Sequence, residues 1–413
     1  MMAPEFLPVW GGTGSYIVEL IKRLPGNVDV HVVTLRRSIP GMDKNKLTDD
    51  VFDSVIGRPI QVHTISSSRE TFFYNVAFQV ACLKNIPKLH KEYKFDIIHS
   101  HLSHMPDVFL KLFNAVSVPT VATVHSTIRM QQAAAVNAHS LFGGLEWSER
   151  NTLLFFPLIE YVQKKYAKRV SRLIAVSKLT KELIKKHLDV DDRRISLVYN
   201  GVDTSLFSPP RKEEIEEKFS NPTVLYVGRL MAKKGLDVLI ESIPKVLQAL
   251  PKTRFLFAGG GNISYYKEML EKEGVSQNNF LFVGHLGFER LALLHKATVF
   301  VNPSFFENCS LSILEAMSCN AAVVASEVGG NPEIIDSGRN GILVPPYQSG
   351  TLAQAIVSLL KNESLNRELG GEARKTVERS FSSQECAQKT YDVYLQVLGI
   401  GRQTDSEGSH RIH

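Results

Sequence analysis

The chain has 413 residues, of which 44% are hydrophobic and 22% are charged. This composition is typical of a globular protein of roughly two or three domains and excludes a fibrous or disordered chain. No C-x2-C pair occurs among the four cysteines, so neither a zinc motif nor a disulfide framework is indicated. The N-terminus lacks the basic and apolar regions of a signal peptide, and no run reaches the roughly 18 apolar residues of a membrane span. We therefore expect a cytoplasmic protein.

Positive charge is concentrated in one part of the chain. Residues 1–208 hold 26 Lys and Arg against 19 Asp and Glu, and within them residues 161–194 hold 11 basic residues against 4 acidic ones. Such a cluster could attract an anionic membrane surface or a phosphorylated acceptor. We favour the simpler interpretation that it is the solvent-exposed face of two amphipathic helices. Nucleic acid is not an expected partner, because aromatic residues do not interleave with the basic ones.

Short runs of apolar and β-branched residues recur along the whole chain, and each is typical of a buried strand. They lie at residues 28–35, 95–99, 118–124, 173–176, 195–199, 223–227, 254–258, 280–283, 298–301, 321–325 and 342–344. Helical patterns follow most of them, the clearest at residues 16–24, 179–187, 236–250, 310–318 and 383–398. This alternation predicts the α/β class, with parallel sheets covered by helices on both faces.

These strands are too many for one doubly wound sheet, and the chain offers a break at Pro209-Pro210, which a charged run follows. We predict two Rossmann-like domains in tandem, over residues 1–207 and 208–382, with a last helix over 383–398 that returns to the first domain and a frayed tail over 399–413. The first three residues are too short for a full strand, although Gly11-Gly12-Thr13-Gly14 resembles the turn that follows one. The first strand is therefore either a stub or incomplete.

Open parallel sheets bind ligands beyond the carboxyl ends of their strands, which selects candidate residues in both domains. In the first domain they are the Gly11-Gly12 turn, His99, His101, His125 and Ser177. In the second domain they are Arg229, Lys234, residues 259–261, His285, residues 307–315 and the Gly329-Gly330 pair. We expect the two sets to face one another across a cleft.

Several of these residues suit a phosphorylated ligand. The Gly11-Gly12 turn leads into a helix whose N-terminal N–H groups could meet a phosphate, or it is a plain tight turn. Arg229 and Lys234 lie between a strand and a helix, where two fixed cations could hold a diphosphate; a lysine-rich surface loop is the alternative. Neither G-x-G-x-x-G nor a P-loop occurs, so hydride transfer and ATP hydrolysis lack their usual support.

The remaining candidates are carboxylates and histidines. Glu307 in a loop and Glu315 on the following helix could contact sugar and ribose hydroxyls, with the helix N-terminus between them for phosphate oxygens. His125 ends a strand and is either structural or functional. His99 and His101 point the same way, but no carboxylate or cysteine accompanies them at ligand spacing, so no metal site is expected.

Together, these segments resemble the retaining nucleotide-sugar glycosyltransferases of the GT-B fold, specifically glycosyltransferase family 4 with its E-x7-E signature. The resemblance runs over nearly the whole chain and is strongest from residue 173 to residue 346. The resemblance is carried by AVSKLTKELI, VYNGVDTSLFSP, LYVGRLMAKKGLDVLI, FLFAGGGN, FLFVGHL, ENCSLSILEAMSCNAAVVAS and VGGNPEIIDSGRNGILVPP. Asn320 stands where that family usually has a helix-ending glycine, and because asparagine tolerates a left-handed backbone we expect the helix to end there.

The resemblance implies a role for each candidate. Arg229 and Lys234 would hold the donor diphosphate and stabilise the leaving nucleotide without a metal or other cofactor, Glu307 would contact the donor sugar, and Glu315 the ribose. The phosphates would meet the main chain at Ser310 and Leu311, the base would lie near His285 and Leu286, and His125 beside the transferred sugar. The donor site would be completed by Gly11, Gly12, Gly228, Gly259 and Gly260.

The implied reaction moves a hexose from a donor of the GDP-mannose or UDP-glucose class to a hydroxyl acceptor, possibly lipid-linked. Because no convincing carboxylate nucleophile is present, retention by double displacement is not favoured over attack on the same face. The alternatives are a GT-B sugar-nucleotide epimerase or hydrolase, a non-catalytic sugar-nucleotide-binding protein and, last, an NAD-dependent oxidoreductase.

Overall fold

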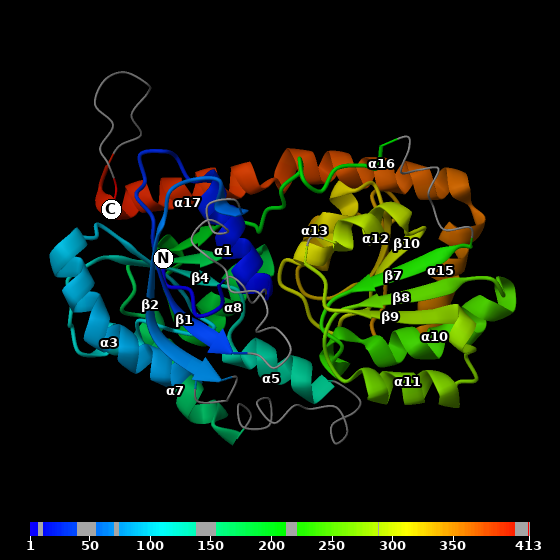
Figure 1. Cartoon of the computed structure of the whole chain (residues 1–413), viewed down its shortest axis with the longest axis horizontal. Coiled ribbons are helices and arrows are strands. Elements are labelled where there is room, and N and C mark those ends of the chain that lie inside the picture. Colours follow the sequence, from blue (N-terminus) through cyan, green and yellow to red (C-terminus); the bar gives the residue numbers. More distant parts are fainter. Residues whose placement is uncertain are drawn as a thin grey trace. The chain divides into compact units, whose positions relative to one another are not determined.

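The computed structural model describes residues 1–6, 11–38, 55–69, 74–137, 154–211, 221–287, 289–400 and 412. The chain forms two compact units (Figure 1). Unit 1 consists of Met1–Gln131, Trp147–Gly201 and Ser383–His413, and unit 2 consists of Gln132–Glu146 and Val202–Ser382. Every strand pairing within the sheets is parallel, which confirms the predicted α/β class.

The described strands of unit 1 form two parallel sheets, which the short first strand at Met2 and Ala3 joins. One sheet pairs β1 (His31–Ser38) with β2 (Gln61–Arg69), and the other has the order β3 (Ile98–His101), β4 (Thr120–Val124), β5 (Arg172–Ala175) and β6 (Ile195–Leu197). Between them, the Ala3 N–H donates to the Val33 carbonyl and the Met2 N–H donates to the His99 carbonyl, both at 2.9 Å. The short first strand is thus a single bridge between β1 and β3.

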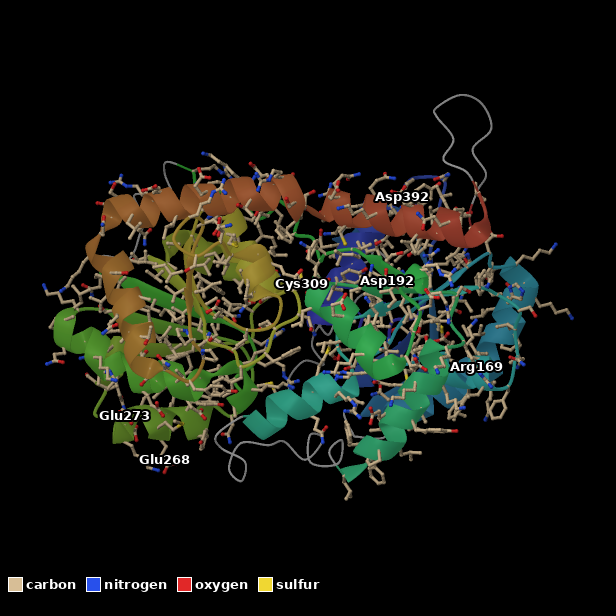
Figure 2. All side chains as sticks on the ribbon, turned by 180° about the vertical axis from the view of Figure 1, so that it is seen from behind. Arg169, Asp192, Glu268, Glu273, Cys309 and Asp392 are labelled. Atoms are coloured by element: carbon tan, nitrogen blue, oxygen red, sulfur yellow. The ribbon has the colours of Figure 1, made fainter. Side chains whose placement is uncertain are left out.

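The described helices of unit 1 are α1 (Gly12–Arg23), α3 (Tyr74–Tyr93), α4 (Val108–Leu112), α7 (Phe156–Ala167), α8 (Lys178–Leu188) and α17 (Ser383–Leu398). The division between the units falls within α5 (Ile128–Asn137), after Gln131. α1 and α17 share one apolar core, to which Ile17, Leu20 and Tyr394 contribute. Arg169, just after α7 and labelled in Figure 2, has a guanidinium that donates to the carbonyls of Lys111 and Leu112 at the end of α4.

The end of the tail that we predicted to fray is held in place at one residue. Ile412 is 2% exposed and forms a parallel bridge with Val28. Its N–H donates to the Asn27 carbonyl at 2.9 Å, and its carbonyl accepts from the Asp29 N–H at 2.7 Å. Backbone pairing and burial therefore correct the prediction for Ile412, while residues 401–411 and 413 lie outside the described part of the chain.

Unit 2 contains one six-stranded parallel sheet. Its order is β12 (Ile342–Val344), β11 (Ala322–Ser326), β10 (Val299–Asn302), β7 (Thr223–Val227), β8 (Arg254–Ala258) and β9 (Phe280–Gly284). From β7 the chain proceeds outward to β8 and β9, then returns to β10 on the other side. The order reverses between β7 and β10, which is the point of such a sheet where ligands bind.

Helices cover both faces of this sheet (Figure 1). Those that the structure describes are α10 (Leu236–Ala249), α11 (Ile263–Lys272), α12 (Arg290–Lys296), α13 (Leu311–Ser318), α14 (Asn331–Ile334), α15 (Ser349–Lys361) and α16 (Glu363–Ser380). α10 and α15 pack together over one face, where Leu239, Ile243 and Ile356 are buried. Each such side chain contributes about 1.5–3 kcal/mol when fully buried. Asn320 has φ of 60°, so the helix that carries Glu315 ends in the left-handed conformation as predicted.

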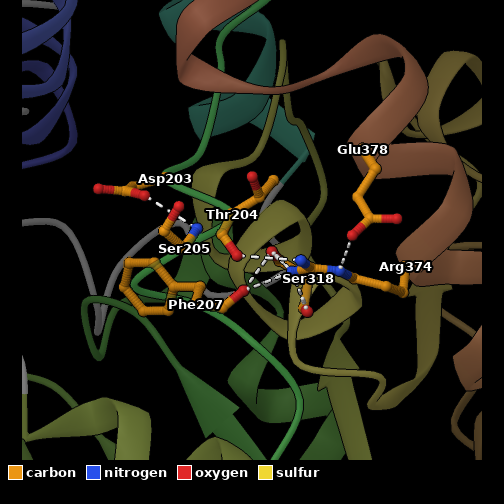
Figure 3. Close-up of polar contacts among 7 residues, drawn as sticks. All are labelled: Asp203, Thr204, Ser205, Phe207, Ser318, Arg374 and Glu378. Atoms are coloured by element: carbon orange, nitrogen blue, oxygen red, sulfur yellow. Dashed lines mark hydrogen bonds and ion pairs between the residues drawn. The ribbon is translucent and has the colours of Figure 1, made fainter.

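The segment before the predicted boundary belongs to unit 2. Val202 bridges to Ser382, and the Phe207 carbonyl accepts from the Ser318 hydroxyl at 2.5 Å. The Arg374 guanidinium on α16 donates to the carbonyls of Thr204, Phe207 and Ser318 at 3.0, 2.8 and 2.8 Å (Figure 3). These tertiary contacts move the division from 207/208, where the sequence places it, to 201/202.

Candidate functional site

The loops that follow β7 and β10 meet at the point where the strand order of unit 2 reverses. Lys234, in a 3-10 turn over Ala232–Lys234, lies in the first loop, and Glu307 lies in the second. The Lys234 Nζ is 2.7 Å from the Glu307 Oε1. The Phe305 N–H donates to the Lys233 carbonyl at 3.0 Å, so a backbone hydrogen bond also joins the loops. Two predicted site residues from separate loops are thus in direct contact.

The carboxylate of Glu307 is held by two further side chains that the sequence analysis missed. Its Oε1 also accepts from the Ser304 hydroxyl at 2.8 Å and from the Asn302 amide at 3.5 Å. Glu307 is 9% exposed, and Ser304 and Asn302 are more deeply buried. Both residues stand at or just after the carboxyl end of β10, so the rule that selected Glu307 could have selected them. Together they fix the direction of a nearly buried carboxylate.

Gly329, in the loop after β11, fixes the backbone of Glu307. Its φ is +58°, and a Cβ at this position would lie 1.7 Å from the Glu307 carbonyl oxygen. The neighbouring Gly330 N–H donates to the same oxygen at 2.8 Å. Only glycine fits the positive φ and the close contact with the Glu307 carbonyl. The Gly329-Gly330 pair therefore fixes the backbone of the Glu307 loop.

The predicted glycines after β7 and β8 lie against each other. The Gly228 N–H donates to the Ala258 carbonyl, and a Cβ on Gly259 would stand 1.8 Å from the Gly228 carbonyl oxygen. The Leu230 N–H donates to the Gly260 carbonyl at 2.8 Å. Arg229, between them, is exposed, and its carbonyl accepts from the Tyr226 hydroxyl at 2.7 Å. The two loops therefore form one backbone platform that carries Arg229.

The N-terminus of α13 and the end of β9 complete the candidate residues of unit 2. Ser310 is the N-cap of α13 and Leu311 its first residue, and the first N–H groups of a helix have no acceptor within it. His285 is exposed and Leu286 half-buried after β9. Glu315, on α13, is 7% exposed and is bound by Arg290 rather than standing alone. All these groups follow the carboxyl ends of strands in the same sheet.

A column of histidines lies at the carboxyl ends of β3 and β4 in unit 1. The His101 Nδ1 is 3.2 Å from the His125 Nε2, and the His99 Nε2 is 2.8 Å from the Thr123 hydroxyl. Burial lowers the pKa of His125 to about 4 and that of His99 to about 3, and it holds the pKa of His101 well below its usual range. These histidines are neutral at pH 7, so His125 can exchange hydrogen bonds but does not carry a positive charge.

The Gly11-Gly12 turn begins the helix that packs against His125. Gly11 is the N-cap of α1 and Gly12 its first residue, and the Tyr16 ring on the same helix packs edge-on against the His125 ring at 4.8 Å between centroids. Ser177 has a structural role, because its hydroxyl caps α8 by accepting from the Thr180 N–H at 3.0 Å. The structure thus connects His125 to α1, the helix that Gly11 and Gly12 begin, through Tyr16.

Much of the basic run over residues 161–194 is engaged in structural contacts. Arg194 donates to the carbonyls of Ala167, Lys168 and Val170, at and just beyond the end of α7. Lys168 pairs with Asp189 at 2.6 Å, an ion pair on the surface. Within the described residues no helix is long and apolar enough to span a membrane, and no group of three or more His, Cys, Asp or Glu could hold a metal ion.

Models of two glycosyltransferase families match the chain in tandem. The one described as Glycosyltransferase Family 4 matches residues 10–206, and the one described as Glycosyl transferases group 1 matches residues 221–362. The alpha-maltose-1-phosphate synthase of Mycolicibacterium smegmatis is 25% identical, with 96% of this chain and 98% of that protein covered.

Two solved structures share the fold along nearly the whole chain. Sucrose-phosphate synthase from Thermosynechococcus elongatus has a TM-score of 0.76 at 20% identity and covers 94% of both chains. HepE of Anabaena, solved in complex with UDP-glucose, has a TM-score of 0.71 at 19% identity, covering 94% of this chain and 96% of its own. The tandem domains, the parallel sheets and these relatives agree: the chain is a glycosyltransferase with the GT-B fold.

Proposed function

We propose that the enzyme transfers a hexose from a nucleoside diphosphate sugar of the UDP-glucose or GDP-mannose class to a hydroxyl acceptor, with retention of the anomeric configuration. The observation that carries the proposal is the contact of Lys234 with Glu307 at 2.7 Å where the strand order reverses. This contact places a cation that can bind a diphosphate next to a carboxylate that can bind sugar hydroxyls. The UDP-glucose bound to HepE, a protein of the same fold, supports this donor class.

In the proposed reaction the acceptor attacks on the face from which the nucleotide leaves. The bond between the sugar C1 and the β-phosphate oxygen breaks, a bond from C1 to the acceptor oxygen forms, and the acceptor proton passes to the departing phosphate. Arg229, Lys234 and the N–H groups at Ser310 and Leu311 stabilise the growing charge, so that no metal is required. In unit 1, the neutral imidazole of His125 has one N–H donor and one acceptor nitrogen, which are the groups that can bind a hydroxyl.

The function is tested with a panel of UDP- and GDP-sugars in buffer that contains EDTA. We expect one class of donor to raise the melting temperature, and that donor with a suitable hydroxyl acceptor to release its nucleoside diphosphate. NMR of the product should show the donor's anomeric configuration. An inverted product, or activity that needs an added divalent ion, would contradict the mechanism. Solvent deuterium at the sugar C2 without an acceptor would instead identify an epimerase.

We further propose that the acceptor lies at an anionic lipid surface that unit 1 contacts through α7. Leu154, two residues before α7, and Leu158 and Tyr161 on it are 72%, 61% and 60% exposed. Lys165 and Lys168, the second of which also pairs with Asp189, continue the same helical stripe. The Lys165 Nζ stands 5.5 Å from the centre of the Tyr161 ring. An apolar stripe that ends in lysines fits the acyl and phosphate layers of an anionic membrane.

Replacement of Leu158 with glutamate is expected to weaken binding to vesicles of phosphatidylglycerol and phosphatidylcholine about 10-fold, because insertion of a leucine contributes about 1.5 kcal/mol or more. Co-sedimentation measures the bound fraction. Leu281→Glu is the matched control, since Leu281 lies in β9 of unit 2 and is 46% exposed. Equal losses in both variants, or equal binding of the unchanged protein to purely zwitterionic vesicles, would refute the lipid contact.

A further inference from the structure

Arg290, the first residue of α12, holds the carboxylate of Glu315 on α13 with both arms of its guanidinium. The Nε donates to Oε2 at 2.8 Å, and the Nη2 donates to Oε1 at 2.6 Å. The two side chains are only 12% and 9% exposed. A planar guanidinium that binds a carboxylate at both oxygens fixes the plane of that carboxylate as well as its position.

Arg290 is itself fixed on two further sides. Its Nη1 donates to the Gly287 carbonyl at 2.5 Å, in the loop that follows β9. Its guanidinium lies 5.1 Å from the centre of the Phe207 ring, and the Phe207 carbonyl accepts from Ser318 on the same helix as Glu315. The arginine therefore joins the Glu315 helix to the loop of His285 and Leu286.

The ion pair with Arg290 leaves Glu315 able to accept further hydrogen bonds in defined directions. An ionised carboxylate offers about four lone-pair positions, of which the guanidinium uses one on each oxygen. The two outer positions remain in the same plane but point away from each other, so each can accept from a single ribose O–H. Without the arginine, a carboxylate this deeply buried would be costly to keep charged.

We propose that Arg290 is a positioning residue that presents the Glu315 carboxylate to the ribose hydroxyls of the bound nucleotide. Through the Gly287 carbonyl it also links ribose recognition to the loop after β9. This inference rests on the proposed function, in which Glu315 contacts the ribose. It assigns to Arg290 the difference in affinity between ribose and deoxyribose nucleotides.

The test compares UDP or GDP, whichever binds the unchanged protein more tightly, with its 2′-deoxy form by titration calorimetry. Hydrogen bonds to charged groups contribute enough that we expect the deoxy form to bind the unchanged protein about 10- to 100-fold more weakly. In Arg290→Met this ratio should fall to about 2-fold or less. Arg290→Lys, which keeps the charge and loses the planar fork, should give an intermediate ratio.

Arg367→Met is the matched control, because Arg367 forms an exposed ion pair with Glu363 in the same unit and its variant should keep the full ratio. A purely structural role for Arg290 would lower affinity for both nucleotides equally, and this unchanged ratio in a folded Arg290→Met would overturn the proposal. If that variant does not fold, an unchanged ratio in Arg290→Lys overturns it. Failure of the unchanged protein to bind either ribonucleotide would instead overturn the proposed function itself.

Discussion

Lys234→Ala is expected to lower kcat about 100- to 1000-fold, the usual cost of removing one preorganised group that stabilises charge in the transition state. In the structure Lys234 is 28% exposed and lies against Glu307 in a loop fixed by the backbone, so its charge needs no rearrangement to meet a diphosphate. Steady-state release of the nucleoside diphosphate measures the effect. Arg229→Ala should show a loss of the same kind, and normal turnover in that variant would refute the assignment of Arg229.

Removal of Lys234 also leaves Glu307 without its cation, so a second set of variants separates the two effects. Glu307 keeps its bonds from Ser304 and Asn302 when the lysine is lost. If the activity of Lys234→Ala falls only because of the unpaired carboxylate, Lys234→Ala combined with Glu307→Gln should be more active than Lys234→Ala alone. We expect no such recovery. Lys233→Ala, in the same turn, is the control for general damage and should retain most activity.

Buried parallel strands are the part of the fold that the sequence predicts best. β7 and β8 have the predicted limits, because strands covered on both faces are continuous apolar runs between turn residues. β12, a half-buried strand at the edge of the sheet, also has the predicted limits. β2 was not predicted, since its described side chains are half-buried or exposed and its sequence contains three consecutive serines. The alternation and apolar content that mark a strand are weak in such an edge position.

Residues of the candidate site were predictable from the sequence only where they directly follow the carboxyl end of a predicted strand. That rule selected Lys234 and Glu307, and it could have found Asn302. It could not find Arg290, which begins a helix after the loop and pairs with a glutamate 25 residues away. Nothing in the local sequence separates that arginine from the many on the surface. The pairing depends on how α12 and α13 pack, which is tertiary information.

Arg374→Ala is expected to lower the free energy of unfolding by about 3 kcal/mol, because it removes partners from the carbonyls of Thr204 and Ser318 (Figure 3). Among the described residues, Arg374 forms five hydrogen bonds, to Glu378, to the Ser318 hydroxyl and to three carbonyls. The Phe207 carbonyl keeps its bond from the Ser318 hydroxyl in the variant, so the loss is smaller than five separate bonds would suggest. The melting temperature of unit 2 should fall by about 6–12 °C in calorimetry, given its size.

The positive charge of Arg374 does not by itself explain its expected contribution to stability. Two further variants separate the effect of the charge from that of the several fixed hydrogen bonds. Arg374 reaches Phe207, 167 residues earlier in the chain, with the same guanidinium that binds Glu378 at 2.7 Å. Arg374→Lys keeps the charge but cannot donate in several fixed directions, so it should recover less than half of the loss. Arg339→Ala removes an exposed arginine 3.7 Å from Asp336 and should change the melting temperature little. Equal shifts for Arg374→Ala and Arg339→Ala would mean that the segment before residue 208 is held by its apolar packing rather than by Arg374.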